Sequence, residues 1–233
     1  ERPGGVPRAF DVISGLFFIE PWILSNVFGL QFFGIEGSFW SLYVEAKFYL
    51  IFGLIYFLSK DKSIHFLVAI FLVGFFYRVI AYVGLIDDSA LIEQVLFGLL
   101  SLNHFGWFCI GALLYLQTKN GGLNYFLLAA LLLPFALYMT AGKNFGVFVF
   151  GLFIFSLFCG SLFVDFLGRI LSGKVLGFFG FISYPLYLIH ENAMVSLTIK
   201  TKVFLGWLPS IFTPIPGLIA IIFVAYIIAR YVE

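Results

Sequence analysis

Charged residues are scarce in this sequence. They make up 11% of the 233 residues, whereas a soluble globular domain contains about 25%. The 13 basic and 12 acidic side chains give a formal net charge of +1, and a nucleic-acid-binding surface usually needs a basic excess. The composition therefore excludes an ordinary soluble domain, and it predicts no nucleic acid among the partners of the protein.

Residues typical of metal and redox sites are also few. The two cysteines, Cys109 and Cys159, lie inside apolar runs, so we expect small core residues and not a disulfide or a metal pair. The three histidines, His65, His104 and His190, are far apart in the sequence, and no H-x-x-x-H or C-x-x-C spacing occurs. We therefore predict that the protein holds no metal. The sequence also lacks a G-x-S-x-G elbow and a Walker-type phosphate loop.

The first ten residues do not have the pattern of a secretory leader. They read ERPGGVPRAF, which is polar and rich in proline and glycine. A signal peptide would have a basic region followed by an apolar core. We expect from this opening that the sequence starts inside a longer protein.

Hydrophobic residues, in contrast, are abundant and occur in long runs. They account for 62% of the chain, and the mean hydropathy is +1.09. A run of about 20 apolar residues is the length that one helical membrane crossing needs. The pattern predicts an all-α, polytopic transmembrane bundle with about seven crossings, at residues 39–58, 64–84, 99–116, 123–140, 145–167, 175–197 and 216–230.

Polar residues interrupt the segment before the first crossing. Asp11, Glu20, Pro21 and Asn26 divide residues 10–35, a pattern better suited to an interfacial or re-entrant segment than to a clean crossing. We therefore divide the chain into a partly ordered interfacial or re-entrant segment at 1–38 and a helical membrane domain at 39–233.

The first crossing carries charge where a membrane helix usually carries leucine. A charged side chain at that depth costs about 2.5 to 3.5 kcal/mol on insertion scales, so it is rarely kept without a partner or a function. On a helix, Ser41, Glu45 and Tyr49 share one face and Lys47 points away from it. Glu45 is therefore a functional candidate. The structural alternative is a glutamate near the interfacial end of its helix, reaching water or a basic neighbour.

A second polar stripe lies in the sixth crossing. Ser183, Tyr187 and His190 recur at i, i+4 and i+7, which places them on one helical face. Pro185 removes one backbone donor beside them. His190 fits a proton carrier, because its ordinary pKa is near 6.5. It equally fits a histidine at the membrane boundary.

Two further patterns concern packing and orientation. Gly106, Gly111 and Ala112 of the third crossing are small enough to let another helix approach closely. With seven crossings, the basic residues divide six to five between the two sides, and the positive-inside rule favours a cytoplasmic C-terminus. The larger group contains Lys60, Lys62, Lys119, Arg169, Lys174 and Arg230, and the smaller contains Arg2, Arg8, Lys143, Lys200 and Lys202.

Three stretches together resemble a known family. WSLYVEAKFYL, Trp40 to Leu50, resembles the W-S-L-x-x-E-x-x-F-Y-L signature of the acyltransferase family 3 of integral membrane acyltransferases. ISYPLYLIH, Ile182 to His190, is similar to the second family signature, near I-S-Y-x-L-Y-L-x-H. FGWFCIGALL, Phe105 to Leu114, resembles the weaker F-x-x-G-x-x-L helix between them. The family includes bacterial O-antigen and peptidoglycan O-acetyltransferases.

The resemblance implies a domain of about ten crossings in the bacterial inner (plasma) membrane. It implies transfer of an acyl group, usually acetyl from acetyl-CoA as the donor co-substrate, to a hydroxyl of a cell-surface carbohydrate. Family members carry a catalytic histidine and basic donor-binding residues upstream of the first signature, and neither His65 nor His104 matches that motif. We therefore expect this chain alone to be inactive and to depend on further N-terminal helices of the same protein. Many members also have Glu-Gln or a similar pair where this chain has Glu45 and Ala46.

The resemblance and the two polar stripes lead to one set of candidate site residues. Glu45 and His190 are the expected catalytic residues, with Glu45 orienting or deprotonating the acceptor or holding the upstream histidine. The expected substrate-binding residues are Trp40, Ser41, Tyr43, Tyr49, Ser183 and Tyr187. Trp40 and Tyr43 stack on a sugar ring in this hypothesis, or else belong to the aromatic belt. The expected partners are the lipid bilayer and a glycan acceptor.

Two other function classes remain open from the sequence. A transporter or flippase for a lipid-linked or acylated glycan would line its path with the same intramembrane charges. A non-catalytic membrane scaffold would assemble with a partner that holds the remaining helices. The transporter alternative predicts inverted repeats, and no repeat of fixed period is visible.

Overall fold

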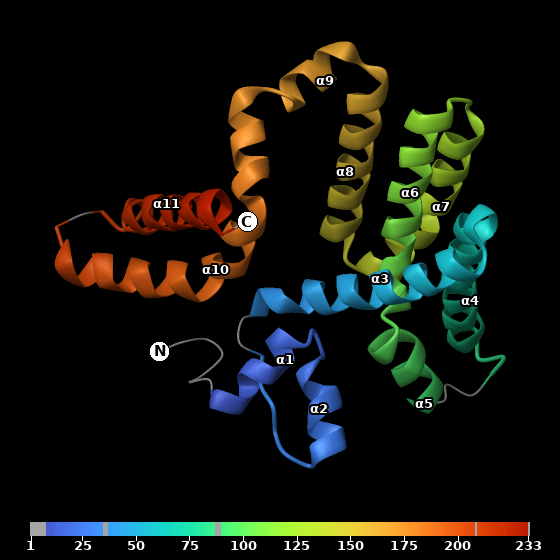
Figure 1. Cartoon of the computed structure of the whole chain (residues 1–233), viewed down its shortest axis with the longest axis horizontal. Coiled ribbons are helices and arrows are strands. Elements are labelled where there is room, and N and C mark those ends of the chain that lie inside the picture. The colour runs from blue at the N-terminus through green and yellow to red at the C-terminus, as the bar shows by residue number, and fades with distance from the viewer. Residues whose placement is uncertain (1–7, 35–36, 87–89, 208, 233) are drawn as a thin grey trace. The chain divides into compact units, whose positions relative to one another are not determined.

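The computed structural model describes residues 8–34, 37–86, 90–207 and 209–232 (Figure 1). Arg2, one of the basic residues of the smaller group, lies outside these residues, as does part of the predicted 1–38 segment. In the described residues every regular element is helical, as the composition predicts. The α-helices are α1 Val12–Leu16, α2 Pro21–Phe28, α3 Trp40–Leu58, α4 Ser63–Tyr82, α5 Ala90–Glu93, α6 Phe105–Asn120, α7 Asn124–Ala141, α8 Phe145–Phe163, α9 Asp165–Leu171, α10 Lys174–Phe204 and α11 Pro214–Tyr231.

Five of the helical segments are long and apolar enough to cross a membrane by themselves. They are Gly37–Leu58, Lys60–Tyr82, Asn124–Ala141, Phe145–Phe163 and Pro214–Tyr231. Two of the remaining predicted crossings correspond to bent pairs of helices, Leu91–Leu99 with Leu102–Asn120 and Asp165–Leu171 with Lys174–Phe204. The all-α transmembrane prediction is therefore confirmed, and each of the seven predicted crossings has a helical counterpart.

A third bent pair lies where the sequence predicts no clean crossing. Residues Ala9–Leu16 and Pro21–Phe28 meet at 119°, an angle that suits a broken span or a re-entrant loop. Asp11 connects this pair to the following segment, because its buried carboxylate accepts hydrogen bonds from the N–H groups of Arg8 (2.8 Å) and Phe33 (3.0 Å). The re-entrant character of the segment stays a prediction.

Several helix boundaries differ from the predicted ones. The third crossing was placed at 99–116, whereas α6 begins at Phe105 and ends at Asn120. The fifth crossing was placed at 145–167, but α8 ends at Phe163 and α9 begins at Asp165. Between them Val164 takes an extended backbone conformation. The sixth crossing was placed at 175–197, whereas α10 continues to Phe204. Figure 1 shows that α10 changes direction along its length, and the helix contains Pro185, which removes one backbone donor as is common in kinked helices.

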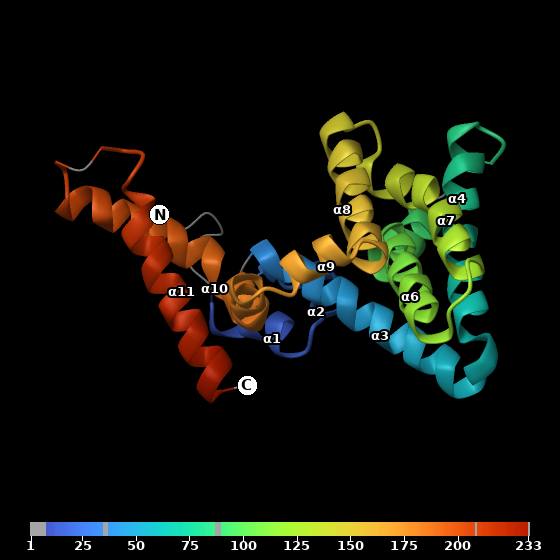
Figure 2. The ribbon, with the colours of Figure 1, turned by 90° about the horizontal axis from the view of Figure 1, so that it is seen from above.

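The chain forms two compact units, which we call the terminal unit (residues 1–43 and 169–233) and the central unit (residues 44–168). In the terminal unit, α11 runs beside α10 (Figure 2). Ile182 of α10 is buried against Ala225 and Ala229 of α11. Gly217 also faces Leu197 closely, since an added Cβ would lie 3.1 Å from the Leu197 Cβ. Small residues thus bring the two helices together, as is common in membrane bundles.

The core of the central unit forms where α4, α6 and α7 meet. Phe71 of α4, Phe105 of α6 and Ala136 of α7 are fully buried there, together with Cys109. Gly106 makes this close approach possible, because a Cβ at that position would lie 2.6 Å from the Ala136 Cβ. Its predicted role as a packing residue is confirmed, and so is the role of Cys109 as a small core residue.

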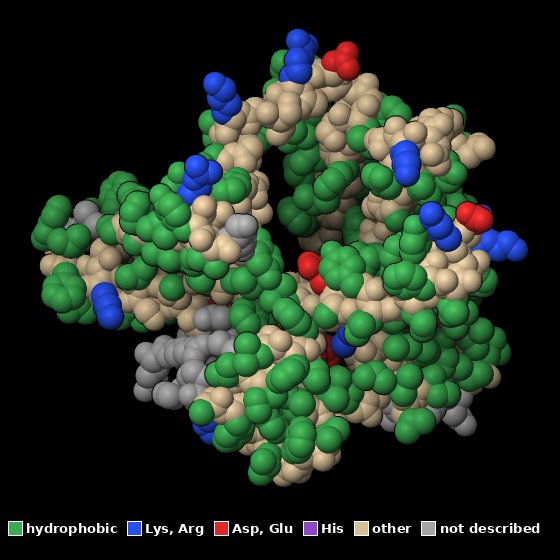
Figure 3. Space-filling model, in the orientation of Figure 1, with side chains coloured by type: hydrophobic (Ala, Val, Ile, Leu, Met, Phe, Trp, Pro, Cys, Tyr) green, Lys and Arg blue, Asp and Glu red, His purple; other side chains and the backbone are tan. Residues whose placement is uncertain are grey.

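Hydrophobic side chains also cover the outside of the helices, as α3 and α8 show. Phe57, Leu50 and Phe145 are more than three-quarters exposed, and hydrophobic side chains are spread over the face in Figure 3, where charged side chains are widely spaced. Burial in lipid is the environment that makes such a surface favourable. The chain is therefore a helical membrane protein.

Candidate functional site

The first feature of the site is the entry into α3. The chain enters this helix through a short 3-10 turn, η2 (Gly37–Phe39). At a helix start the backbone N–H groups lack intrahelical acceptors. Here the Glu191 carboxylate of α10 accepts the N–H of Ser38 at 2.7 Å. A carboxylate at this end of a helix is also favoured by the helix dipole.

Gly37 allows the carboxylate to approach so closely. A Cβ at Gly37 would overlap the carboxylate oxygens and the Cδ atom of Glu191. Any other residue at this position would force the Glu191 side chain to move. The backbone of η2 and the side chain of α10 therefore fit each other only because residue 37 lacks a side chain.

Tyr187, one turn before Glu191 on α10, makes two further bonds to the same turn. Its hydroxyl donates to the Ser38 carbonyl oxygen at 2.7 Å and accepts from the Ser41 hydroxyl at 2.9 Å. Ser41 belongs to the first signature stretch and Tyr187 to the second. The structure thus brings the two stretches together inside the terminal unit, through Ser38, Ser41, Tyr187 and Glu191.

The Ser38 hydroxyl is the unusual group in this cluster. Ser38 is 7% exposed, yet its Oγ has no hydrogen-bond partner among the described residues. Buried hydroxyls are normally hydrogen-bonded, and exceptions often mark a place where water or a ligand binds. The cluster therefore offers an unused donor and acceptor beside a carboxylate and a phenol.

The other two residues of the α10 stripe lie beside Tyr187 without joining η2. The exposed His190 has its Nδ1 atom 2.7 Å from the Tyr187 carbonyl oxygen, and its ring centroid is 5.7 Å from that of Tyr187. Ser183 is exposed and donates to the Gly180 carbonyl oxygen at 2.7 Å. Tyr187 and His190 are thus adjacent, while the Ser183 hydroxyl is used within its own helix.

The predicted aromatic substrate-binding residues have different environments. Trp40 is 54% exposed and Tyr49 is 63% exposed. Tyr43 is only 4% exposed, and its hydroxyl lies 3.5 Å from the Ser14 Oγ of α1. Tyr43 therefore connects α1 to α3 inside the terminal unit, an environment that favours a packing role over stacking on a sugar.

The two charges of α3 have different surroundings in the central unit. The Glu45 side chain is exposed. The Lys47 ammonium donates to the Gly98 carbonyl oxygen (2.8 Å) and to the Ser101 hydroxyl (2.9 Å). These acceptors lie where the π-helical turn η4 (Gln94–Leu99) ends and Ser101 takes a left-handed conformation with φ 54°. Lys47 therefore donates a hydrogen bond to a backbone carbonyl group that, in a regular helix, would accept one from the helix itself. Substitute donors of this kind allow irregular backbone to occur in membrane proteins.

Glu191, Ser38 and Gly37 were not among the predicted site residues. The signal for Glu191 was present, because it follows Tyr187 by four residues and such residues lie on the same helical face. The predicted stripe instead continues from Tyr187 to His190 at i+3. Ser38 and Gly37 gave no comparable signal, since their environment depends on a helix about 150 residues away in the sequence.

Metal ligands do not gather in the part of the chain that the structure describes, where no group of three His, Cys, Asp or Glu side chains could hold an ion.

The comparisons with known proteins gave no match. No protein-family model, curated protein or solved structure is significantly similar to the chain. The chemistry of the site is therefore argued from its own residues.

Proposed function

We propose that this chain is part of a membrane-bound acyltransferase that moves an acyl group, acetyl from acetyl-CoA, to a hydroxyl of a cell-surface carbohydrate. The observation that carries the proposal is the hydrogen bond between Ser41 and Tyr187. It joins the two stretches that resemble the acyltransferase family 3 signatures, and beside it lies the buried Ser38 hydroxyl, which has no hydrogen-bond partner in the described part of the chain.

The residues around this bond suit the binding of a hydroxylated acceptor. Ser38 offers a hydroxyl that can donate and accept, and the exposed Trp40 next to η2 offers a ring face to a sugar. The exposed His190 lies one turn along α10 from Tyr187, and its imidazole can reach a bound substrate and accept a proton from it.

The reaction needs a base for the acceptor hydroxyl. The acceptor oxygen attacks the thioester carbonyl carbon, so that a C–O bond forms, the C–S bond breaks, the hydroxyl proton passes to the base, and the thiolate leaves. In the proposal Glu45 and His190 are the catalytic residues. Glu45 accepts or directs the acceptor proton, or holds a histidine supplied by another part of the protein.

The test is Glu45→Gln in the product of the complete coding sequence, assayed by transfer of labelled acetyl from acetyl-CoA to membrane glycan. Loss of a general base lowers the rate by about 100-fold or more, and we expect a loss of that size. Asp61→Asn is the matched control, because Asp61 is an exposed carboxylate in the turn after α3. Full turnover in a folded Glu45→Gln protein would remove Glu45 from the chemistry.

His190→Asn needs a second measurement beside the transfer rate. If transfer falls while the thermal unfolding temperature stays unchanged, the imidazole acts on the substrate.

Movement of a labelled glycan lipid across the bilayer without a change in its mass would contradict the acyltransferase proposal and favour the transporter.

A further inference from the structure

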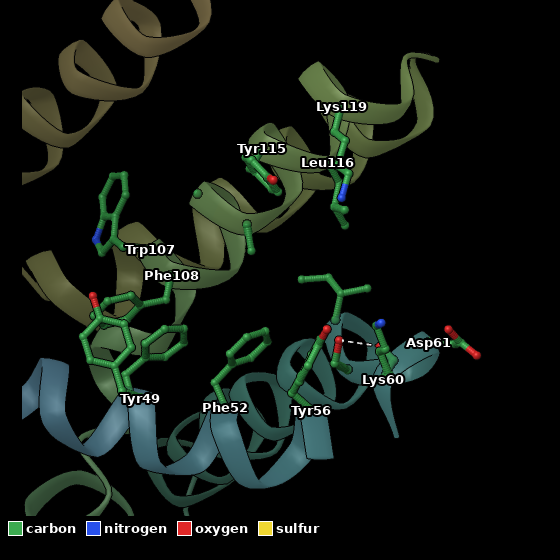
Figure 4. A pocket seen from close by; sticks show the side chains of 15 residues that line it. Tyr49, Phe52, Tyr56, Lys60, Asp61, Trp107, Phe108, Tyr115, Leu116 and Lys119 are labelled. Carbon is green, nitrogen blue, oxygen red and sulfur yellow. Dashed lines mark hydrogen bonds between the residues drawn. The ribbon is translucent and has the colours of Figure 1, made fainter. Parts of the chain in front are cut away.

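An apolar groove of about 820 Å³ opens between α3 and α6 in the central unit. The two helices touch at Phe48 and Phe108, whose rings stack with centroids 3.9 Å apart. Figure 4 shows that they separate from there toward the ends that carry Lys60 and Lys119. The groove therefore widens toward the polar turns at one end of the central unit.

The walls of the groove are aromatic. Tyr49, Phe52 and Tyr56 line it from α3, and Trp107, Phe108 and Tyr115 line it from α6 (Figure 4). Its floor is open at Gly111, where an added Cβ would have no neighbour within 4 Å. Gly111 was predicted to receive a closely packed helix, but among the described residues nothing packs against it. The groove is thus a slot for flexible apolar groups.

Two cations mark the wide end. Lys60 lies in the turn η3 (Lys60–Lys62) with its Nζ 5.9 Å from the Tyr56 ring centroid, and Lys119 lies in the last turn of α6. Figure 4 shows both lysine side chains at this end of the groove, and the carboxylate of Asp61, which also lines the groove, lies beyond Lys60. No ion pair to either lysine occurs among the described residues. Such a pair of ammonium groups complements an anionic headgroup.

The length of the groove matches one leaflet of a bilayer. Residues 49 to 60 advance along α3 by about 16 Å at the usual rise per residue, and half of the hydrocarbon core is about 15 Å thick. Lys60 follows the last apolar residues of α3 at Phe57 and Leu58, and it belongs to the polar turn SKDKS. An acyl chain that enters beside the lysines and follows α3 over this length reaches Tyr49 and Trp107 at the narrow end of the groove.

We propose that the groove between α3 and α6 is a binding site for an anionic phospholipid of the bilayer, with the phosphate between Lys60 and Lys119 and an acyl chain against Trp107. The site does not depend on the acyl-transfer proposal, because it uses neither Glu45 nor His190, and it places Tyr49, which the sequence predicts to bind substrate, in the lining of this groove instead. An uncharged lipid fills the apolar part equally well. The lysines are what make the site selective.

Trp107 provides a direct signal for the occupied groove. The protein contains 4 tryptophans, and the fluorescence difference between the wild type and Trp107→Phe isolates the signal of this one. The full-length protein is held in phosphatidylcholine micelles, and phosphatidylglycerol with brominated acyl chains is titrated in. This lipid should quench the Trp107 fluorescence. We expect half-maximal quenching at about tenfold lower mole fraction than with brominated phosphatidylcholine, since each lysine near a membrane surface favours anionic lipid.

Two pairs of variants separate the proposal from general lipid contact. Lys60→Gln combined with Lys119→Gln should remove the preference for phosphatidylglycerol, whereas Lys143→Gln, in the turn between α7 and α8, should keep it. Gly111→Leu should fill the groove and abolish quenching by either lipid. Gly53→Leu, at a position of α3 that is equally open and outside the groove lining, should not.

Three results would overturn the proposal. Equal quenching by the two brominated lipids would make the groove an unselective lipid contact. An unchanged preference for phosphatidylglycerol after loss of both lysines would show that the headgroup binds at another place. Absence of any Trp107 quenching in the full-length protein would mean that another segment or partner occupies the groove. None of these results bears on acyl transfer, which is measured separately through Glu45.

Discussion

Glu191 of α10 accepts the backbone N–H of Ser38 at 2.7 Å, across a separation of 153 residues. This bond places a carboxylate at the start of the helix that carries Glu45 and Lys47. It is possible only because Gly37 leaves room for it. Together with the Tyr187 hydroxyl, it holds η2 and the start of α3 against α10.

Gly37→Ala should therefore destabilise the protein through Glu191. The new methyl group displaces the carboxylate and breaks a charge-assisted hydrogen bond, so we expect a loss of about 1 to 2 kcal/mol in the free energy of unfolding in mixed micelles. The same substitution in a Glu191→Ala background should cost much less, because the carboxylate is then gone. Gly53→Ala, at an open position of α3, is the control. Equal costs in both backgrounds would mean that Gly37 matters for another reason.

Tyr187→Phe should cost about 1 to 3 kcal/mol of the same free energy, since it leaves the Ser38 carbonyl and the Ser41 hydroxyl with only the long 3.4 Å hydrogen bond between them. Ser41→Ala should cost less, and the double variant should show a coupling energy of about 0.5 kcal/mol or more. Tyr184→Phe, at an exposed tyrosine on the same helix, should be nearly neutral. Strict additivity of Tyr187→Phe and Ser41→Ala would contradict a direct bond between the two hydroxyls.

Lys47→Met should loosen the irregular segment around η4. The ammonium bonds to Gly98 and Ser101 are lost while the apolar length of the side chain is kept, so we expect a cost of about 2 kcal/mol. Amide hydrogen exchange should rise in residues 94–104 more than elsewhere in the central unit. Lys62→Met, at an exposed turn position, should leave exchange in this segment unchanged. Protection that survives Lys47→Met would show that the helix break is held by other contacts.

Gly106→Ala and Gly111→Ala should behave differently although both lie on α6. At Gly106 the methyl group meets Ala136 and Phe71, whose ring atoms would be 2.8 and 2.9 Å away. Overpacking of this kind costs about 1 to 3 kcal/mol. At Gly111 the methyl group has open space, and the change should be neutral or slightly stabilising, because alanine favours a helix by about 1 kcal/mol over glycine. Thermal unfolding of the two variants side by side tests this, and similar melting temperatures would refute the packing assignment at Gly106.

The sequence alone determined the class of the protein and the positions of its helices. Hydropathy and charge content are local properties, and in lipid a chain must satisfy its backbone hydrogen bonds within each segment, so apolar runs become helices wherever they occur. The same local logic placed Ser183, Tyr187 and His190 on one face of α10. It also marked residues 10–35 as an unusual segment, which the structure describes as helices meeting at 119°.

The tertiary structure decided which residues face each other. Gly106 and Gly111 are alike in the sequence, yet one meets Ala136 and the other lines an open groove, because α6 is close to α7 at one position and diverges from α3 at the other. Likewise Glu191 binds η2 while His190 stays exposed beside Tyr187. Such pairings depend on the angles at which helices pack, which are set by contacts between residues far apart in the chain and not by local composition.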